Sequence, residues 1–208
     1  YCEMREGSKF ISRPITGAHS KDHVIERYLD VARYLGAEVD GIEFPLPDLT
    51  KESKAVAEKL QNKGLNGDYV VMVPGARWET KVWPPENYAK LAEMIIENGT
   101  SVVLAGGPDG QTSLRELAAL IKGSSFYISG DTGPLHFAAA LKKPLIAMYG
   151  PTKADRTGPY GSNNSTVIIS PAKCAGCLKK HCSDWHCMYD ITPEMVFETY
   201  TKKRGEMN

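Results

Sequence analysis

The stretch FYISGDTGPLHFAAALKKPLIAMYG, residues 126–150, contains the pattern of a strand, a turn, a helix and a second strand in close succession. Residues 126–129 are aromatic and β-branched, which favours a strand, and the apolar run at 145–149 favours another. Between them, Pro134 suits the first turn of a helix that continues through alanines to Leu141. The stretch therefore predicts a β-α-β unit.

Asp131, Thr132 and Gly133 directly follow the first of these strands. In an open parallel sheet, ligands bind at the carboxyl ends of the strands, and the N–H groups at a helix amino terminus favour an anion. A simpler alternative is that Asp131 and Thr132 only cap the helix, as such residues do in many loops of this kind.

The same alternation extends outward from this unit. Apolar strands are expected at 69–73 and 101–104, and a helix is expected to open at residues 84–86. Ser113 and Glu116 form a capping-box pattern at the start of a further helix. Strand–helix alternation at this spacing predicts an α/β fold, a Rossmann-like doubly wound parallel sheet over about residues 66–170.

Three further helices are expected outside this alternation, at 21–36, at 50–60 and from Thr192 onward. The proline-rich residues 44–48 predict a linker. The expected division is an N-terminal segment with its linker at 1–48, an α/β domain at 49–170, and a Cys-rich loop with a C-terminal helix at 171–208.

The bulk composition excludes some classes of protein. The chain has 208 residues, and its 25 Lys and Arg residues balance 25 Asp and Glu residues, so nucleic acid is not an expected partner. No stretch approaches the about 20 apolar residues that span a bilayer, and the start lacks a signal-peptide pattern. We therefore expect a soluble, cytoplasmic protein without a transmembrane segment. The first residue is Tyr1 rather than Met, which indicates a fragment or a partly recorded chain.

Three loops are expected to meet at one edge of the sheet. Glycines in these loops let a ligand approach the backbone closely, and a lysine beside a helix terminus suits a diphosphate. No loop matches the dinucleotide or P-loop glycine pattern, and a packed histidine and a solvated lysine are the simpler alternatives. The loop residues are Gly75, Arg77 and Lys81, then Gly106, Gly107 and Asp109, then Asp131, Thr132, Gly133 and His136.

Several of these motifs resemble glycosyltransferase family 9, whose best-known members are ADP-heptose:lipopolysaccharide heptosyltransferases. The matching segments are PGARWETKVWPPENYAKLAE (74–93), AGGPDG (105–110), TSLRELAALI (112–121) and SGDTGPLHFAAALKKPLIAMYGPT (129–152). The resemblance implies a GT-B architecture, in which two Rossmann-like domains face a cleft and the C-terminal domain holds the sugar nucleotide. By this resemblance, residues 1–48 would be only a remnant of the N-terminal acceptor domain with its linker, and residues 49–170 would be the nucleotide-sugar-binding domain.

The resemblance also implies roles for individual residues. Lys81 and Asp131 are the candidate catalytic residues, and Lys81 would contact the diphosphate. Asp109, where the family usually has Glu, would reach the ribose, and the backbone around Thr112 would meet the adenine. The candidate substrate-binding residues are Ala76, Arg77, Lys81, Asp109, Thr112, Asp131, Thr132, Gly133 and His136.

One connection departs from the family pattern. The family usually has a helix and a strand between the GGP loop and the TSL helix, where this chain has only residues 108–111. Either the chain carries a deletion or the recorded sequence omits a segment. A true deletion would remove a strand from the sheet and compromise the nucleotide pocket.

The resemblance implies an inverting glycosyltransferase that moves heptose from an ADP-sugar donor to a lipid-linked lipopolysaccharide inner-core acceptor at the inner face of the inner membrane. Lys81 and the helix terminus would stabilise the leaving diphosphate, and a carboxylate of the missing N-terminal region would deprotonate the acceptor hydroxyl. No cofactor is required for this chemistry. The alternative is a non-catalytic nucleotide- or sugar-binding module, because the chain shown supplies no base.

Four cysteines near the C-terminus have close spacing, and they are Cys174, Cys177, Cys182 and Cys187. Four thiolates at this spacing suit a structural zinc, and a reducing cytoplasm favours metal binding over disulfides. Free thiols and a disulfide are the alternatives. A zinc-knuckle nucleic-acid binder is a third functional hypothesis, which the zero net charge opposes.

Overall fold

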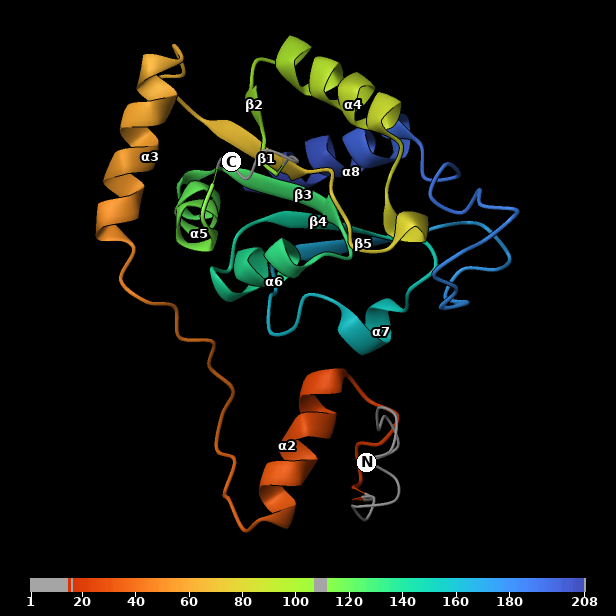
Figure 1. Ribbon diagram of the computed structural model, residues 1–208. Helices are drawn as coiled ribbons and strands as arrows, with labels where there is room; N and C mark the ends of the chain where they lie inside the picture. Colours follow the sequence, from red (N-terminus) through yellow and green to blue (C-terminus); the bar gives the residue numbers. More distant parts are fainter. Residues whose placement is uncertain (1–14, 16, 107–111, 208) are drawn as a thin grey trace.

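The computed structural model describes residues 15, 17–106 and 112–207, and at its centre lies a five-stranded parallel sheet with the order β2-β1-β3-β4-β5 (Figure 1). The strands are β1 (Tyr69–Val73), β2 (Ser101–Leu104), β3 (Phe126–Gly130), β4 (Leu145–Tyr149) and β5 (Ser165–Ile169). The first four lie where the apolar runs predicted them, whereas β5 was not predicted. The expected α/β fold with a parallel sheet is confirmed.

The helices also follow the local sequence signals. Ser113 and Glu116 form the predicted capping box: the Ser113 hydroxyl accepts from the Glu116 backbone N–H, and the Glu116 carboxylate accepts from the Ser113 N–H. The helices are α2 (Val24–Tyr34), α3 (Thr50–Asn62), α4 (Pro85–Glu97), α5 (Leu114–Gly123), α6 (Gly133–Ala140), α7 (Ala154–Thr157) and α8 (Pro193–Gly205), with a short 3-10 turn η1 (Glu79–Lys81).

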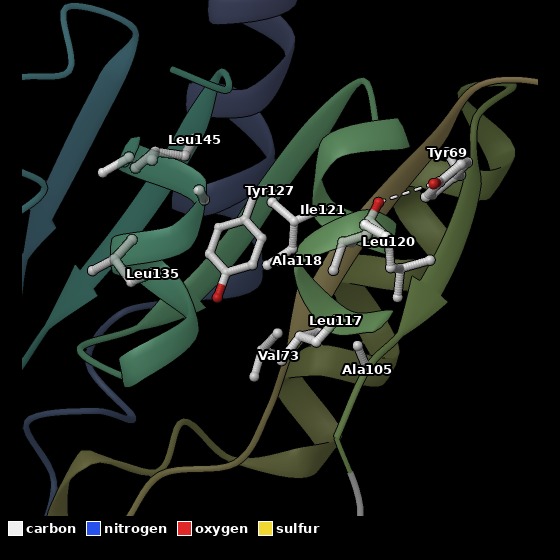
Figure 2. Close-up of a cluster of buried hydrophobic side chains, with 14 of the residues drawn as sticks. Tyr69, Val73, Ala105, Leu117, Ala118, Leu120, Ile121, Tyr127, Leu135 and Leu145 are labelled. Carbon is white, nitrogen blue, oxygen red and sulfur yellow. Dashed lines mark hydrogen bonds between the residues drawn. The ribbon is translucent and has the colours of Figure 1, made fainter. Parts of the chain in front are cut away.

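The three central strands, β1, β3 and β4, are buried along their whole length. Since successive residues of a strand point to opposite sides, both faces of the sheet are covered there. Tyr127 of β3 joins a cluster with residues of α3, α5 and α6, in which the Tyr69 hydroxyl donates to the Leu120 carbonyl (Figure 2). Its neighbours Phe126 and Ile128 join a second cluster with α4 and α8. The continuous apolar runs that predicted the strands are thus explained by a helix layer on each side.

The chain order of the strands places a crevice between β1 and β3. From β1 the chain moves outward to β2, and then it crosses back to β3 on the other side of β1. Such a reversal of direction opens a crevice at the carboxyl edge of a parallel sheet, which is where ligands bind in this kind of fold. The loops that follow β1 and β3 border this crevice.

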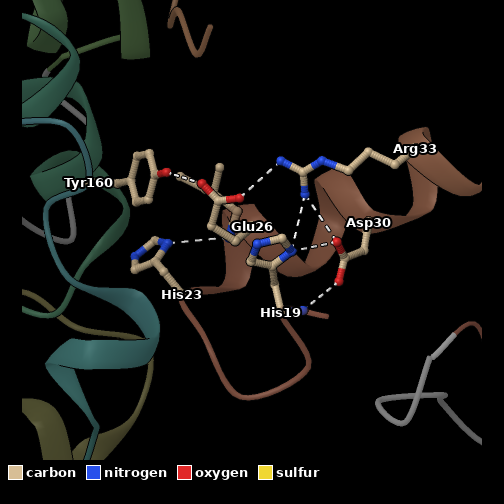
Figure 3. A network of polar contacts seen from close by, with 7 residues as sticks. His19, His23, Glu26, Asp30, Arg33 and Tyr160 are labelled. Carbon is tan, nitrogen blue, oxygen red and sulfur yellow. Dashed lines mark hydrogen bonds and ion pairs between the residues drawn. The ribbon is translucent and has the colours of Figure 1, made fainter. Parts of the chain in front are cut away.

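Helix α2 lies away from the sheet and is connected to α3 by the extended residues 37–49, which include the predicted linker (Figure 1). It contacts the loop after α7, where the His23 ring nitrogen Nε2 lies 3.1 Å from the Gly158 carbonyl and the Tyr160 hydroxyl donates to Glu26. Within the N-terminal part, Asp30 binds the His19 ring at 2.7 Å (Figure 3). These polar contacts, together with the packing of the His23 ring on the Tyr160 ring, link the start of α2 to the domain.

The C-terminal helix packs into the same core as the sheet. Thr192 caps α8 as predicted, and its side chain accepts from the Met195 N–H. Val196 and Tyr200 are fully buried against the second cluster, with Tyr200 edge-on to Phe126. In the part of the chain that the structure describes, none of the helices combines the length and the apolarity that crossing a bilayer requires.

Candidate functional site

A cavity of about 710 Å³ lies at the carboxyl edge of the sheet, where the loops after β1, β3 and β4 meet. Seven of the nine predicted substrate-binding residues line it, which brings together side chains from two distant parts of the sequence. These seven are Ala76, Arg77, Lys81, Asp131, Thr132, Gly133 and His136. Whether they bind a substrate stays a prediction.

The loop after β1 is held by buried hydrogen bonds. The Tyr88 hydroxyl donates to the carbonyl of Val73, the last residue of β1, at 3.1 Å. The chain then turns through η1, where the Lys81 N–H donates to the Trp78 carbonyl. This turn directs the Lys81 side chain toward the loop after β3.

Lys81 and Asp131 form an ion pair across the crevice. The Lys81 Nζ lies 3.3 Å from Asp131 Oδ2, and the two side chains are only 15% and 10% exposed. The backbones also approach closely, because a Cβ added at Gly130 would lie 3.3 Å from the Lys81 carbonyl oxygen. Glycine at this position permits the contact between the two loops.

The start of α6 is open toward the cavity. Thr132 is the N-cap residue, but its side chain makes no capping hydrogen bond, so the simple capping alternative is wrong for this residue. A Cβ added at Gly133 would meet no heavy atom within 4 Å. The amino terminus of an eight-residue helix therefore borders free space, and its dipole favours an anion there.

His136 lies one turn into α6 and also lines the cavity. Neighbouring protein partly desolvates the ring and lowers the pKa of His136 below its ordinary value, and the nearby Asp131 carboxylate opposes this shift. The ring nonetheless stays accessible to solvent, so it differs from the packed histidine of the simpler alternative. His136 is therefore neutral at pH 7 and can gain a proton at lower pH.

The loop after β4 contributes a further wall of the cavity. The sequence favours a surface loop for Thr152 and Arg156 and leaves closure over a ligand as the alternative. Both residues line the cavity, and Thr152 is only 7% exposed. With Arg77, Lys81 and Lys153, Arg156 gives the described lining four cationic side chains against the single carboxylate of Asp131. This excess of positive charge suits an anionic ligand.

Two predicted residues are not placed in the cavity. Thr112 is described but does not line it. Asp109, together with Gly107 of the same loop, lies outside the described residues. Their expected contacts with adenine and ribose stay predictions.

The Cys-rich segment lies beside the cavity, which its residue Leu178 lines. Its four cysteines are free thiols. Burial, followed by the neighbouring thiols, raises the pKa of Cys187 to about 11, so this side chain stays protonated at neutral pH. Among residues 15, 17–106 and 112–207, no group of three or more Cys, His, Asp and Glu side chains is arranged to hold a metal ion. The zinc site stays a prediction that this arrangement does not support.

The sequence matches known proteins along most of its length. The model of glycosyltransferase family 9 (heptosyltransferase) matches residues 2–110 and 109–187. Lipopolysaccharide heptosyltransferase 1 of Pseudomonas aeruginosa is 31% identical over 180 residues, which cover 77% of this chain and 49% of the relative. Lipooligosaccharide heptosyltransferase 2 of Haemophilus influenzae is 30% identical over 228 residues, which cover 92% of this chain and 66% of the relative.

The fold matches as well. The solved structure of the ADP-heptose LPS heptosyltransferase II of E. coli superposes with a TM-score of 0.70 at 25% identity, over 88% of this chain and 62% of that chain. The expected GT-B type of Rossmann-like domain is confirmed by this similarity and by the parallel sheet. The chain spans between about half and two thirds of the length of these proteins.

Proposed function

The chain belongs to glycosyltransferase family 9, and we propose that it is the donor-binding part of an inverting heptosyltransferase, which transfers heptose from ADP-heptose to an inner-core lipopolysaccharide acceptor. We assign donor binding to residues 49–170, the N-terminal remnant and linker to 1–48, and the Cys-rich loop with its helix to 171–208. The transfer is assigned to the complete protein.

The observation that carries this proposal is the position of the Lys81–Asp131 pair beside the open terminus of α6. A cation, a helix dipole and the further cations of the cavity all favour a diphosphate at the same edge of the sheet. The cavity volume of about 710 Å³ falls in the usual range for small-molecule sites.

In the proposed reaction, the acceptor hydroxyl oxygen attacks the anomeric carbon of the heptose from the side opposite the diphosphate. The bond between that carbon and the diphosphate oxygen breaks, ADP leaves with the electron pair, and the acceptor proton passes to a carboxylate base that we do not assign to the three loops. Lys81 and the N–H groups at the start of α6 stabilise the negative charge that develops on the leaving oxygen.

Calorimetry with ADP and a transfer assay test the proposal on the complete protein. Lys81→Ala is expected to raise the Kd for ADP about tenfold or more and to slow transfer, because a charge-assisted contact is lost. Lys90→Ala is the matched control, since this exposed lysine pairs with Glu194 on the far layer of helices. Unchanged donor affinity and turnover in Lys81→Ala would contradict the assignment.

A non-catalytic nucleotide- or sugar-binding module is the second candidate, because the cationic lining of the cavity suits binding of an anion whether or not transfer follows. Binding of ADP without transfer by the complete protein would select the module. Transfer to a lipid-linked saccharide would select the enzyme, for which we propose a cytoplasmic location at the inner face of the inner membrane.

We propose no cofactor for the transfer itself. For the Cys-rich segment, the spacing of the four cysteines still makes a structural zinc a hypothesis to test. Metal analysis of protein purified without chelators decides it: one zinc per chain, lost on Cys174→Ser, would support the metal site, and metal-free protein of unchanged stability would exclude it.

A further inference from the structure

The segment that carries the first three clustered cysteines also forms part of the cavity wall. The Gly176 N–H donates to the Gly150 carbonyl at 2.9 Å, and the Leu178 N–H donates to the Pro151 carbonyl at 2.7 Å. Leu178 lines the cavity and has a positive φ of 62°, a conformation that a leucine adopts only when its surroundings hold it there. The segment is thus anchored to the loop after β4.

The same segment forms two hydrogen bonds with Thr80 in the loop after β1. The Thr80 hydroxyl donates to the Lys179 carbonyl at 2.7 Å, and the Trp185 indole N–H donates to the Thr80 carbonyl at 2.9 Å. Thr80 is only 2% exposed, so both bonds are shielded from water at this residue. Residues about 100 positions away in the sequence therefore fix the residue that precedes Lys81.

The turn that carries Lys81 needs such support. It is a three-residue 3-10 turn, and turns of this kind have poor hydrogen-bond geometry of their own. The Lys81 ammonium lies 5.0 Å from the centre of the Trp78 ring, and the Lys180 ammonium lies 5.2 Å from the same ring. The Cys-rich segment therefore contacts this turn in two ways: through hydrogen bonds at Thr80, and through Lys180 at the ring of Trp78, which precedes the turn.

We infer that Trp185 and Thr80 are positioning residues, which hold the Lys81 ammonium where it meets the diphosphate of the donor. The inference depends on the proposed function, because it assigns these residues to the same donor site. Neither residue touches the ligand in this account: both act through the backbone of the Lys81 turn.

Conservative substitutions of the two residues test the inference in the complete protein. Trp185→Phe keeps an aromatic ring but removes the indole N–H, and Thr80→Val keeps the shape but removes the hydroxyl. Each is expected to raise the Kd for ADP, measured by calorimetry, about fivefold, the usual effect of one lost hydrogen bond. Thr80→Ser restores a hydroxyl and is expected to recover most of that affinity.

Tyr69→Phe is the matched control, because it removes a buried hydrogen bond to a backbone carbonyl at the opposite edge of the sheet. It is expected to lower the Tm without changing the Kd for ADP. A double-mutant cycle separates positioning from general stability: in a Lys81→Ala background, Trp185→Phe is expected to change the Kd less than twofold.

Two results would overturn the inference alone. One is a Kd within twofold of the wild-type value for both Trp185→Phe and Thr80→Val, while Lys81→Ala still weakens binding. The other is a Trp185→Phe effect that persists in full without the Lys81 ammonium. A wild-type protein that neither binds ADP nor transfers heptose would instead overturn the proposed function, and the inference with it.

Discussion

The ammonium of Lys81 lies 3.3 Å from the carboxylate of Asp131, although 50 positions separate the two residues in the sequence. The register of the sheet explains the contact. Val73 of β1 pairs with Ser129 of β3, so the loops that carry Lys81 and Asp131 begin side by side at the same edge. Before a ligand binds, the carboxylate partly neutralises the ammonium.

Replacement of Asp131 by Asn is expected to strengthen ADP binding. The variant removes a negative charge beside the expected diphosphate and leaves the Lys81 ammonium without its competing partner. We expect the Kd for ADP to fall about threefold to tenfold, as measured by calorimetry at low salt, and the gain to shrink as salt is added. A loss of affinity as large as that of Lys81→Ala would show that the carboxylate itself binds ADP.

Gly133→Ala is expected to separate ligand binding from stability. The added methyl group meets no protein atom within 4 Å, and alanine favours a helix, so the free energy of unfolding should stay equal or rise by about 0.5–1 kcal/mol. Because Gly133 lines the cavity, the Kd for ADP should rise on the order of fivefold. Urea denaturation and calorimetry measure the two effects, and unchanged affinity would place the ligand away from α6.

Gly150→Ala, unlike Gly133→Ala, is expected to lower the stability of the fold. A Cβ at this position would lie 2.5 Å from the Met188 sulfur and 3.0 Å from the Cys187 sulfur, so these two buried side chains would have to move. Overpacking of this kind costs about 1–3 kcal/mol, and for a chain of this size each kcal/mol lowers the Tm by about 2–4 °C. Thermal unfolding followed by circular dichroism measures the change. A Tm equal to the wild-type value would mean that the segment packs loosely on β4.

His136 should make ADP binding depend on pH. Desolvation lowers the pKa of His136 below its ordinary value of 6.5. The ring is therefore neutral at pH 7.5 and gains a positive charge only as the pH falls below 6.5. As the pH is lowered, the Kd for ADP should therefore decrease in the wild type. The decrease should be smaller in His136→Asn, which serves as the control because ADP itself titrates in the same way with both proteins. Since the unfolded chain binds this proton more readily, the free energy of unfolding should also decrease as the pH falls below 6.5.

Glu116 should contribute to acid unfolding. The hydrogen bond from Lys59, with those from Ser113, lowers the pKa of Glu116 from 4.5 to about 2. Its contribution to stability is thus complete above pH 4.5 and is lost as the pH falls toward 2. Urea denaturation from pH 7 to pH 3 should show the wild type losing its advantage over Glu116→Gln below pH 4.5. A constant difference over that range would contradict the prediction.

Much of the fold could be predicted because its signals are local. The apolar runs of β1, β2, β3 and β4 are bounded by loops, and the capping box at Ser113 needs only residues three positions apart. Strand β5 escaped prediction because it opens with two polar residues, Ser165 and Thr166, which leave only a short apolar run.

The site was predictable only in part, because only some of its contacts follow from local sequence signals. Parallel strands place their following loops at one edge, so the meeting of Lys81 with Asp131 follows from the strand assignments. The roles of Thr152 and Trp185 do not, because both depend on packing between segments that no short sequence pattern joins. Thr152 becomes buried only when the loop after β4 folds over the cavity, and Trp185 reaches Thr80 across 105 positions.

The missing side chain at Gly130 has a practical consequence for protein engineering. Even one methyl group there would press on the carbonyl of Lys81 at 3.3 Å and displace the turn by a few tenths of an ångström. Libraries that aim to alter which sugar nucleotide the proposed donor site accepts should therefore keep position 130 and the 80–82 turn unchanged. Diversity is better introduced along residues 152–157, where new side chains would reshape the opposite wall without disturbing that spacing.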